Sequence, residues 1–83
     1  MILNIFSPEQ TIYSGEAESV KVPGKNQRPF VILDSHAPVV AVLETGVVTY
    51  IANKNEHELN IKSGFVEIRE NVVTICVEIL MNV

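Results

Sequence analysis

The fold of this chain is decided by residues 65–79, which read FVEIRENVVTICVEI. From Val73 to Ile79 apolar residues occupy every second position, which is the period of a β-strand with one buried face. Phe65 to Arg69 forms a shorter strand-like run, and the turn-forming pair Glu70-Asn71 separates the two runs. Residues 65–79 therefore predict a β-hairpin.

Similar patterns extend upstream of this hairpin. Gly46 to Ala52 and His57 to Lys62 predict a second hairpin across the polar segment 53–56. We expect three further strands, at Ile2 to Phe6, Glu16 to Val22 and Phe30 to Leu33. Val39 to Glu44 fits either a short strand or a bend. Turn-forming residues recur at short intervals between these runs, which is typical of short antiparallel strands.

The length and composition favour one small all-β domain. A chain of 83 residues has room for a single hydrophobic core, so we expect one domain over residues 1–83. Val and Ile are abundant and runs of helix-forming residues are scarce. We therefore expect an all-β fold of short antiparallel strands, either a sandwich or a barrel.

Charge and cysteine content exclude several classes of protein. The net charge is −4, and no basic stripe is present, so we expect no nucleic-acid partner. No run approaches the roughly 18 apolar residues of a membrane span, and residues 1–10 lack the basic start of a signal peptide. We therefore expect no direct membrane insertion. The single cysteine, Cys76, favours a reducing compartment and an inert, half-buried thiol.

The sequence offers no grouping typical of catalysis. Ser35 precedes His36 directly, but neighbours in an extended chain point to opposite faces, and no nucleophile elbow surrounds any serine. Glu16 and Glu18 are expected on one face of a strand, where we interpret them as solvated carboxylates rather than an acid–base pair. We therefore expect no catalytic residues.

Metal and nucleotide sites are not expected either. Glu56, His57 and Glu58 are consecutive, so they cannot converge on one ion from a strand, and we interpret them as a solvated hairpin end. The four glycines form neither a phosphate-binding loop nor a dinucleotide fingerprint. The sequence predicts no cofactor and no nucleotide-binding residues.

Three sets of short motifs follow one another along the chain. The first set is Phe6 to Glu9, Ile12 to Glu16 and Ser19 to Gly24. The second is Phe30 to Leu33 with His36-Ala37-Pro38, and the third is Ser63 to Ile68 with Asn71-x-Val73-Thr74-Ile75. In this order they resemble the N-terminal β-sandwich domain of the epsilon subunit of rotary ATP synthases, called delta in mitochondria. The resemblance covers nearly the whole chain, and it implies an all-β fold, a two-sheet antiparallel β-sandwich of about eight to ten short strands.

The resemblance implies a rotor subunit of the central stalk without catalysis of its own. Its partners would be the gamma subunit and the ring of c subunits, with the catalytic alpha/beta head contacted indirectly. It would couple proton flow to ATP synthesis at the cytoplasmic face of the bacterial inner membrane, held there by the complex. The sandwich end with Ser7, His36, Ala37 and Pro38 would face gamma, and the loop with Gln27, Arg28, Pro29 and Phe30 would face the c-ring.

Some alternatives remain open at this stage. His36 fits either a hydrogen-bonded turn residue or a direct contact to gamma. The stretch from Lys25 to Pro29 departs from the glycine-rich, acidic family pattern. Because the sequence ends at Val83, with Val77 to Val83 interpreted as a strand end, we expect a short form without the C-terminal helical hairpin and without inhibition by such an arm. The alternative function is a stand-alone all-β ligand- or protein-binding module.

Overall fold

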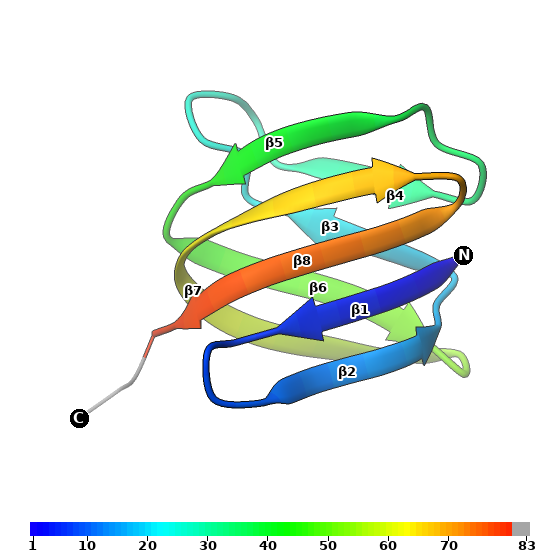
Figure 1. Cartoon of the computed structure of the whole chain (residues 1–83), viewed down its shortest axis with the longest axis horizontal. Helices are drawn as coiled ribbons and strands as arrows, with labels where there is room; N and C mark the ends of the chain where they lie inside the picture. Colours follow the sequence, from blue (N-terminus) through cyan, green and yellow to red (C-terminus); the bar gives the residue numbers. More distant parts are fainter. Residues whose placement is uncertain (81–83) are drawn as a thin grey trace.

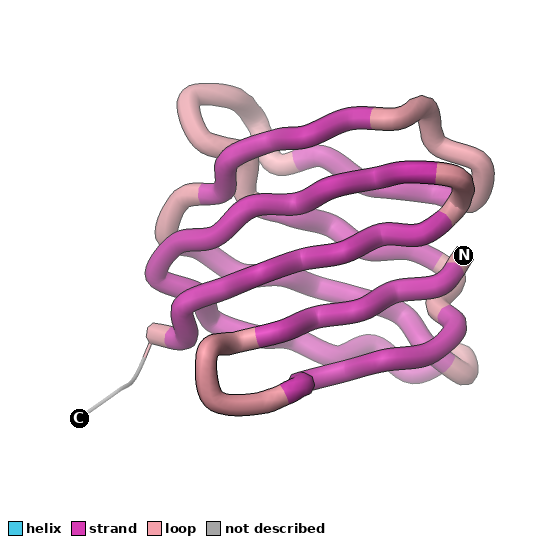
Figure 2. Tube along the Cα trace, viewed as in Figure 1, coloured by secondary structure: helices cyan, strands magenta, loops and turns pink. Residues whose placement is uncertain are grey.

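The computed structural model describes residues 1–80 and consists of β-strands joined by turns and loops (Figures 1 and 2). The strands are β1 (Ile2–Phe6), β2 (Thr11–Glu16), β3 (Ser19–Val22), β4 (Phe30–Leu33), β5 (Val39–Leu43), β6 (Gly46–Ala52), β7 (Asn55–Arg69) and β8 (Val72–Ile79). Residues 81–83 are not described, so the expected strand end at Met81 and Val83 lies outside the described residues.

The strands form two packed layers that share one long strand. Hydrogen bonds connect them in the order β2-β1-β8-β7-β6-β3-β4, and β5 also pairs with β7. Residues Asn55 to Ile61 of β7 pair with β6, whereas Ile61 to Arg69 pair with β8, and the register shifts between Ile61 and Ser63. The front layer thus contains β2, β1, β8, the second half of β7 and β5; the back layer contains the first half of β7, β6, β3 and β4 (Figure 1). The all-β sandwich is confirmed.

One strand pair differs from the antiparallel expectation. β1 runs parallel to β8, from Ile2 beside Val72 to Phe6 beside Cys76. The β7–β8 turn lies at the end of the sandwich where β1 begins, and the amide of Ile2 donates to the carbonyl of Asn71 at 3.1 Å. β1 therefore lies between β2 and β8 and runs in the same direction as β8.

The core lies between the two layers and is wholly apolar. Alternate residues of the central strands point inward, and none of the described residues buries a polar or charged side chain. The fully buried large side chains include Leu3, Ile5, Ile32, Ile61, Ile68 and Ile75. Each contributes about 1.5–3 kcal/mol by leaving water. Val73, Ile75 and Val77 lie on the buried face of β8, as their spacing predicts.

Both sequence-predicted hairpins close with two-residue turns. Asn53 and Lys54 have φ angles of 51° and 65°, and Glu70 and Asn71 have 50° and 61°. Two adjacent left-handed residues are typical of the type I′ turn, whose twist matches that of the flanking strands. The polar loop expected over 53–56 is shorter in the structure, because Ala52 already pairs with Asn55.

Three strand boundaries differ from the sequence prediction. Thr11–Glu16 forms β2, an edge strand held by backbone pairing to β1, where no strand was expected. The strand expected over 16–22 is limited to Ser19–Val22, so Glu16 and Glu18 do not share a strand face; both are exposed. Residues 57–62 and 65–69 belong to a single strand, β7. The ambiguous segment near residue 40 is a strand.

Aromatic rings pack the gap between the layers beside β2. The rings of Tyr13 and Tyr50 lie with centroids 5.0 Å apart, and His57 stacks on Tyr50 at 5.0 Å. The Tyr13 hydroxyl donates to the carbonyl of Glu16 at 2.6 Å. Burial raises the pKa of the Tyr50 hydroxyl. His57 is exposed, as expected for a solvated hairpin end, and one face of its ring contacts Tyr50.

Candidate protein-binding surfaces

The sandwich has two ends, and the sequence-predicted contact residues are divided between them. The Met1 end carries the chain start, the loop 34–38 and the turn at Asn71, since Ser35 and Ile2 both bond to Asn71. The opposite end, here the Ser7 end, carries the loop 7–10 and the loop 23–29 (Figure 1). The expectation that Ser7 and His36 share one end is wrong, because Ser7 follows the last residue of β1 at one end, whereas His36 lies between β4 and β5 at the other. Contact with gamma stays a prediction for each.

Ser7 forms a closed turn at the end of β1. Its amide donates to the carbonyl of Gln10 at 2.9 Å, and its hydroxyl bridges the carbonyl and amide of Gln10 at 3.2 and 3.3 Å. Pro8 fixes φ at the next position of this turn. The Ser7 hydroxyl thus shapes the turn, and any partner meets a preformed surface.

His36 lies half-buried in the loop between β4 and β5. Its amide donates to the carbonyl of Leu33 at 3.2 Å, and its ring Nδ1 lies 2.8 Å from the carbonyl oxygen of Ala37. Because a carbonyl oxygen only accepts, Nδ1 must carry the proton in this contact. His36 is therefore a hydrogen-bonded turn residue whose Nε2 takes no part in that bond. Ala37 and Pro38 follow it and are exposed.

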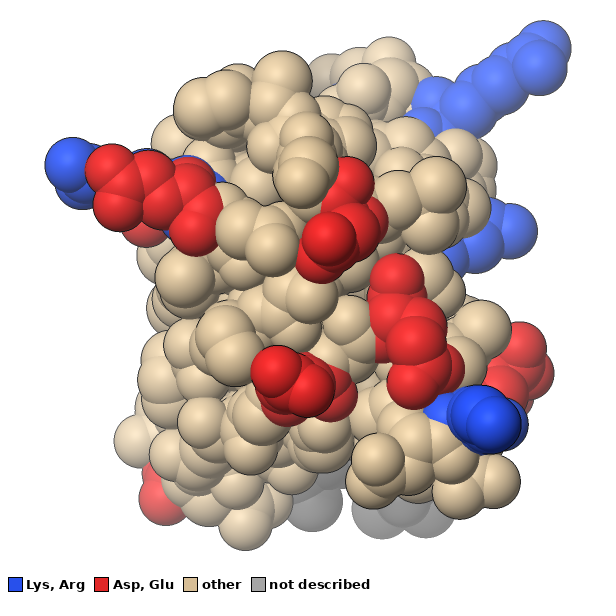
Figure 3. Space-filling view, turned by 90° about the vertical axis from the view of Figure 1, so that its right-hand side faces the viewer, with Lys and Arg blue, Asp and Glu red and all other residues tan. Residues whose placement is uncertain are grey.

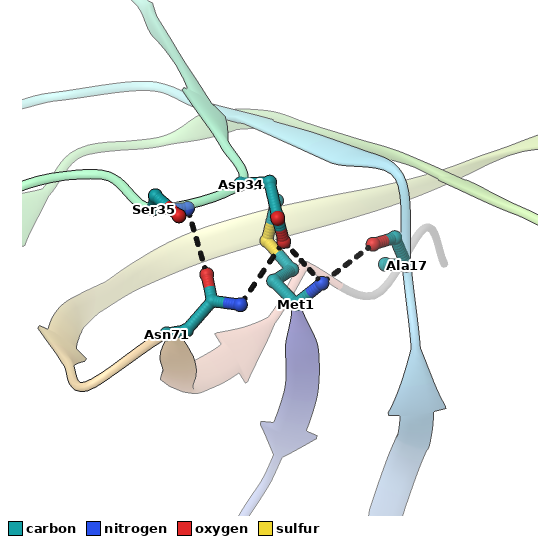
Figure 4. A network of polar contacts seen from close by, with 5 residues as sticks. All are labelled: Met1, Ala17, Asp34, Ser35 and Asn71. Atoms are coloured by element: carbon teal, nitrogen blue, oxygen red, sulfur yellow. Dashed lines mark hydrogen bonds and ion pairs between the residues drawn. The ribbon is translucent and has the colours of Figure 1, made fainter.

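A polar network holds this loop against the start of the chain (Figure 4). The Met1 ammonium donates to Asp34 Oδ1 at 2.8 Å, and the Asn71 side-chain amide donates to the same oxygen at 3.0 Å. The amide of Ser35 donates to Asn71 Oδ1 at 2.8 Å, and Ser35 has a φ of 62°. Asn71 is a motif residue of the sequence, but no local pattern indicates this role for it, and none indicates a role for Asp34.

The network changes the acidity of Asp34. Hydrogen bonds from the Met1 ammonium and then from Asn71 hold the pKa of Asp34 below its usual value of 3.8. A carboxyl group whose pKa is lower in the folded chain than in the unfolded chain stabilises the fold at every pH above its unfolded-state pKa. This contribution is lost as the pH falls through the folded-state pKa. The contribution of Asp34 is thus complete at neutral pH.

We expect Asp34→Asn to lower the free energy of unfolding at neutral pH, and this difference from the unchanged chain to shrink as the pH falls below about 4. Urea unfolding at several pH values measures the difference. Glu70→Gln is the matched control, since it removes one exposed carboxylate at the same end without touching the network. A difference for Asp34→Asn that stays constant down to acidic pH would contradict the assignment.

The Met1 end is predominantly acidic. Figure 3 looks onto this end and shows red carboxylates spread over it, with blue basic groups at its margins. Exposed carboxylates here include Asp34 and Glu70, and Glu18 accepts from the amide of Lys54 at 3.3 Å. Such an end favours a partner surface with basic or hydrogen-bond-donating groups.

The loop expected to face the c-ring lies at the Ser7 end. Gln27, Arg28 and Pro29 are exposed, and Phe30 is half-buried at the start of β4. The base of the loop is fixed, because the amide of Lys25 donates to the carbonyl of Val42 at 2.9 Å and the amide of Asn26 to Glu44 at 3.3 Å. The loop thus presents a basic tip on an anchored base.

An exposed apolar row crosses the outer face of the front layer. Cross-strand pairing places Val42 beside Phe65, Phe65 beside Cys76, and Cys76 beside Phe6. Val42, Phe65 and Phe6 are 57%, 47% and 36% exposed. Cys76 is half-buried, as predicted. We call these four residues the apolar row. The row was not predicted from the sequence. Alternation along β7 does place Phe65 on the outer face of the strand, since its neighbour Val66 lies on the buried face.

Two shallow hollows adjoin this face, and both lie near predicted contact residues. One, of about 370 Å³, lies between Phe6, Phe65 and Cys76, with Ser7 at its rim. The other, of about 490 Å³, runs beside Pro38 and Val40 near the Met1 end. The described residues hold no group of three or more potential metal-ligating side chains. No helix able to cross a bilayer occurs in residues 1–80.

The fold and these surfaces define a small all-β domain with exposed apolar and charged surfaces suited to protein partners. The chain belongs to the family described as the beta-sandwich domain of the ATP synthase delta/epsilon chain, whose model matches residues 1–83. An ATP synthase epsilon chain of Leptospira borgpetersenii is 37% identical over 88% of this chain, and one of Desulfitobacterium hafniense is 40% identical over 88%. That of Rhodopseudomonas palustris is 35% identical over 96%.

This chain spans little more than half of these relatives, namely 57%, 54% and 58% of their respective lengths. Two solved structures share its fold. A chain from the central stalk and c-ring structure of the Tetrahymena thermophila mitochondrial ATP synthase gives a TM-score of 0.81 at 16% identity, covering 98% of this chain and 65% of that one. A chain from the Euglena gracilis mitochondrial ATP synthase gives 0.85 at 20% identity, covering 93% and 49%.

Proposed function

We propose that this domain belongs to the rotor of a proton-translocating ATP synthase, where it binds gamma and the c-ring and couples proton flow to ATP synthesis. It performs no catalysis of its own, and the complex holds it at the cytoplasmic face of the bacterial inner membrane. The observation that carries the proposal is the family match over residues 1–83, together with relatives that are ATP synthase epsilon chains.

The division of the contact residues between two ends shapes how gamma would bind. β1 has five residues, so at about 3.3 Å per residue it separates the Ser7 turn from the Met1 end by roughly 17 Å. One elongated partner along the outer face of the front layer reaches both Ser7 and Pro38, and it covers the apolar row, which begins at Phe6 beside Ser7. We assign this face to gamma.

The c-ring contact is assigned to the loop with Gln27, Arg28, Pro29 and Phe30. The loop projects from the Ser7 end, and its anchored base at Lys25 and Asn26 keeps its tip in place. Arg28 adds positive charge at the tip, so the facing surface of the ring should supply carboxylates or backbone carbonyls.

Co-purification with gamma tests the proposal. We expect this chain, expressed with the gamma subunit of the same synthase, to be recovered in a stoichiometric complex that then binds the c-ring. Failure to bind gamma at micromolar concentrations would remove the rotor assignment and leave the alternative of a stand-alone binding module.

We expect His36→Asp to weaken gamma binding by more than about 1 kcal/mol, the usual mark of a significant interface residue. The change removes the imidazole Nε2 as a contact group, and it removes the hydrogen bond from Nδ1 to the carbonyl of Ala37 that holds the loop in shape. Calorimetric titration measures the affinity, and Asn53→Asp serves as the control, since it adds a carboxylate in the turn between β6 and β7 of the back layer. An affinity unchanged by His36→Asp would remove His36 from the interface while leaving the rest of the face assigned.

A further inference from the structure

Asn71 joins three segments of the chain at the Met1 end (Figure 4). Its side-chain Oδ1 accepts from the amide of Ser35 at 2.8 Å, and its Nδ2 donates to Asp34 at 3.0 Å. Its backbone carbonyl accepts from the amide of Ile2 at 3.1 Å. Asn71 itself belongs to the turn between β7 and β8. One residue therefore ties this turn to the loop between β4 and β5 and to the start of β1.

The backbone of the loop 34–38 is strained at the point where Asn71 holds it. Ser35 has a φ of 62°, in the left-handed region that a residue other than glycine rarely adopts. Such a conformation costs free energy and persists only where its surroundings fix it. The side chain of Asn71 fixes two adjacent residues here, Asp34 and Ser35. Without these two bonds, we expect the loop to sample several shapes.

The same loop leads to the hollow of about 490 Å³ near the Met1 end. Two segments line this hollow: Pro38 and Val40 follow the loop, and residues 67–70 precede the turn at Asn71. The pairing of β5 with β7 begins at Val39 and fixes the two segments from there onward. Pro38 lies just outside this pairing, so its position at the hollow depends on the loop that Asn71 holds.

We propose that Asn71 is a positioning residue for the protein partner of the front layer, because it holds the loop 34–38 and Pro38 in the shape that this partner binds. The inference rests on the assignment of this face to gamma. Binding to a loop that is already held in one shape avoids the loss of conformational freedom that ordering the loop would cost. If the binding shape is present only part of the time, the apparent affinity falls by that fraction.

Replacing Asn71 by glycine tests the side chain without breaking the turn. Glycine readily adopts a left-handed φ and is favoured in this type of turn, so the hairpin and the carbonyl bond to Ile2 should persist. Both side-chain bonds to the loop are lost. Asn53→Gly is the matched control, because it makes the same change at a left-handed position of the turn between β6 and β7. Thermal unfolding checks that both variants are folded.

Rapid-mixing kinetics with gamma separates positioning from direct contact. For Asn71→Gly we expect the association rate constant to fall about tenfold, as for a loop that keeps the binding shape about a tenth of the time. The dissociation rate constant should change by less than about twofold, whereas substitution of a residue that touches gamma mostly raises it. Asn53→Gly should leave both constants within about twofold of the unchanged chain.

Amide hydrogen exchange of the free chain gives a readout that does not need gamma. The amide of Ser35 should exchange faster in Asn71→Gly than in the unchanged chain, because its acceptor is gone. An unchanged exchange rate would overturn the proposal. So would an unchanged association rate constant, a loss found only in dissociation, or an equal loss for Asn53→Gly; each of these leaves gamma binding itself intact. If gamma does not bind the unchanged chain either, the rotor assignment is wrong and this inference is wrong with it.

Discussion

Replacing Gly64 by alanine should destabilise the domain by about 2–3 kcal/mol, the upper part of the range for overpacking a tight site. Gly64 lies in β7 just after the register shift, opposite Val77. An added Cβ would collide with the carbonyl oxygen of Cys76 and lie 3.2 Å from the Cα of Val77. Both obstacles are backbone atoms, so relief requires the two strands to separate.

Urea unfolding at neutral pH measures this loss, and Ser63→Ala provides the control. Ser63 is the exposed neighbour of Gly64 and already carries a Cβ, so this change only removes a hydroxyl, and its effect should stay within about 0.5 kcal/mol. A loss below about 1 kcal/mol for Gly64→Ala would mean that β7 and β8 yield easily. Because small domains have a net stability of only about 0.05–0.15 kcal/mol per residue, the expected loss is a large share of the total.

Phe65→Asp should weaken gamma binding by about 2 kcal/mol or more, a change of roughly thirtyfold or greater in affinity. Phe65 lies in the apolar row between Val42 and Cys76, and it borders the hollow beside Ser7. Aromatic residues at the centre of an interface usually carry much of its binding energy, and a carboxylate there would be buried without a partner.

Val47→Asp is the matched control for this prediction. Val47 is 41% exposed, close to the 47% of Phe65, but it lies on the outer face of the back layer. Calorimetric titration of gamma with each variant, after thermal unfolding has shown that both remain folded, separates the two faces. If both variants lose the same affinity for gamma, or if Val47→Asp loses more, the assignment of gamma to the front layer is wrong.

Sequence periodicity predicted the strands whose one face is buried. β1, β4, β6 and β8 begin and end where predicted, since alternation and turn residues mark their limits. β2 was missed because its sequence, TIYSGE, buries no face; backbone bonds to β1 hold it as an edge strand. β7 was predicted as two strands because Ser63-Gly64 resembles a turn. In the structure one strand continues through these residues with a shifted register.

The placement of the candidate sites could be predicted only in part. Local motifs identified the His36 turn, and its hydrogen bonds to Leu33 and Ala37 lie within a few residues. The separation of Ser7 from His36 depends on β1 lying parallel to β8, a contact between chain segments about 70 residues apart in the sequence (Ile2 beside Val72). Such long-range pairing leaves no local signal.

The continuity of β7 has a mechanical consequence for how the domain bears a load. In many sandwiches the layers meet only through side chains, and a sideways load can slide one layer over the other. Here a single covalent strand belongs to both layers, bonded to β6 along its first half and to β8 and β5 along its second. A load on the front layer is passed along this strand into the back layer, where it strains several ladder bonds at once. The domain is therefore stiff in shear.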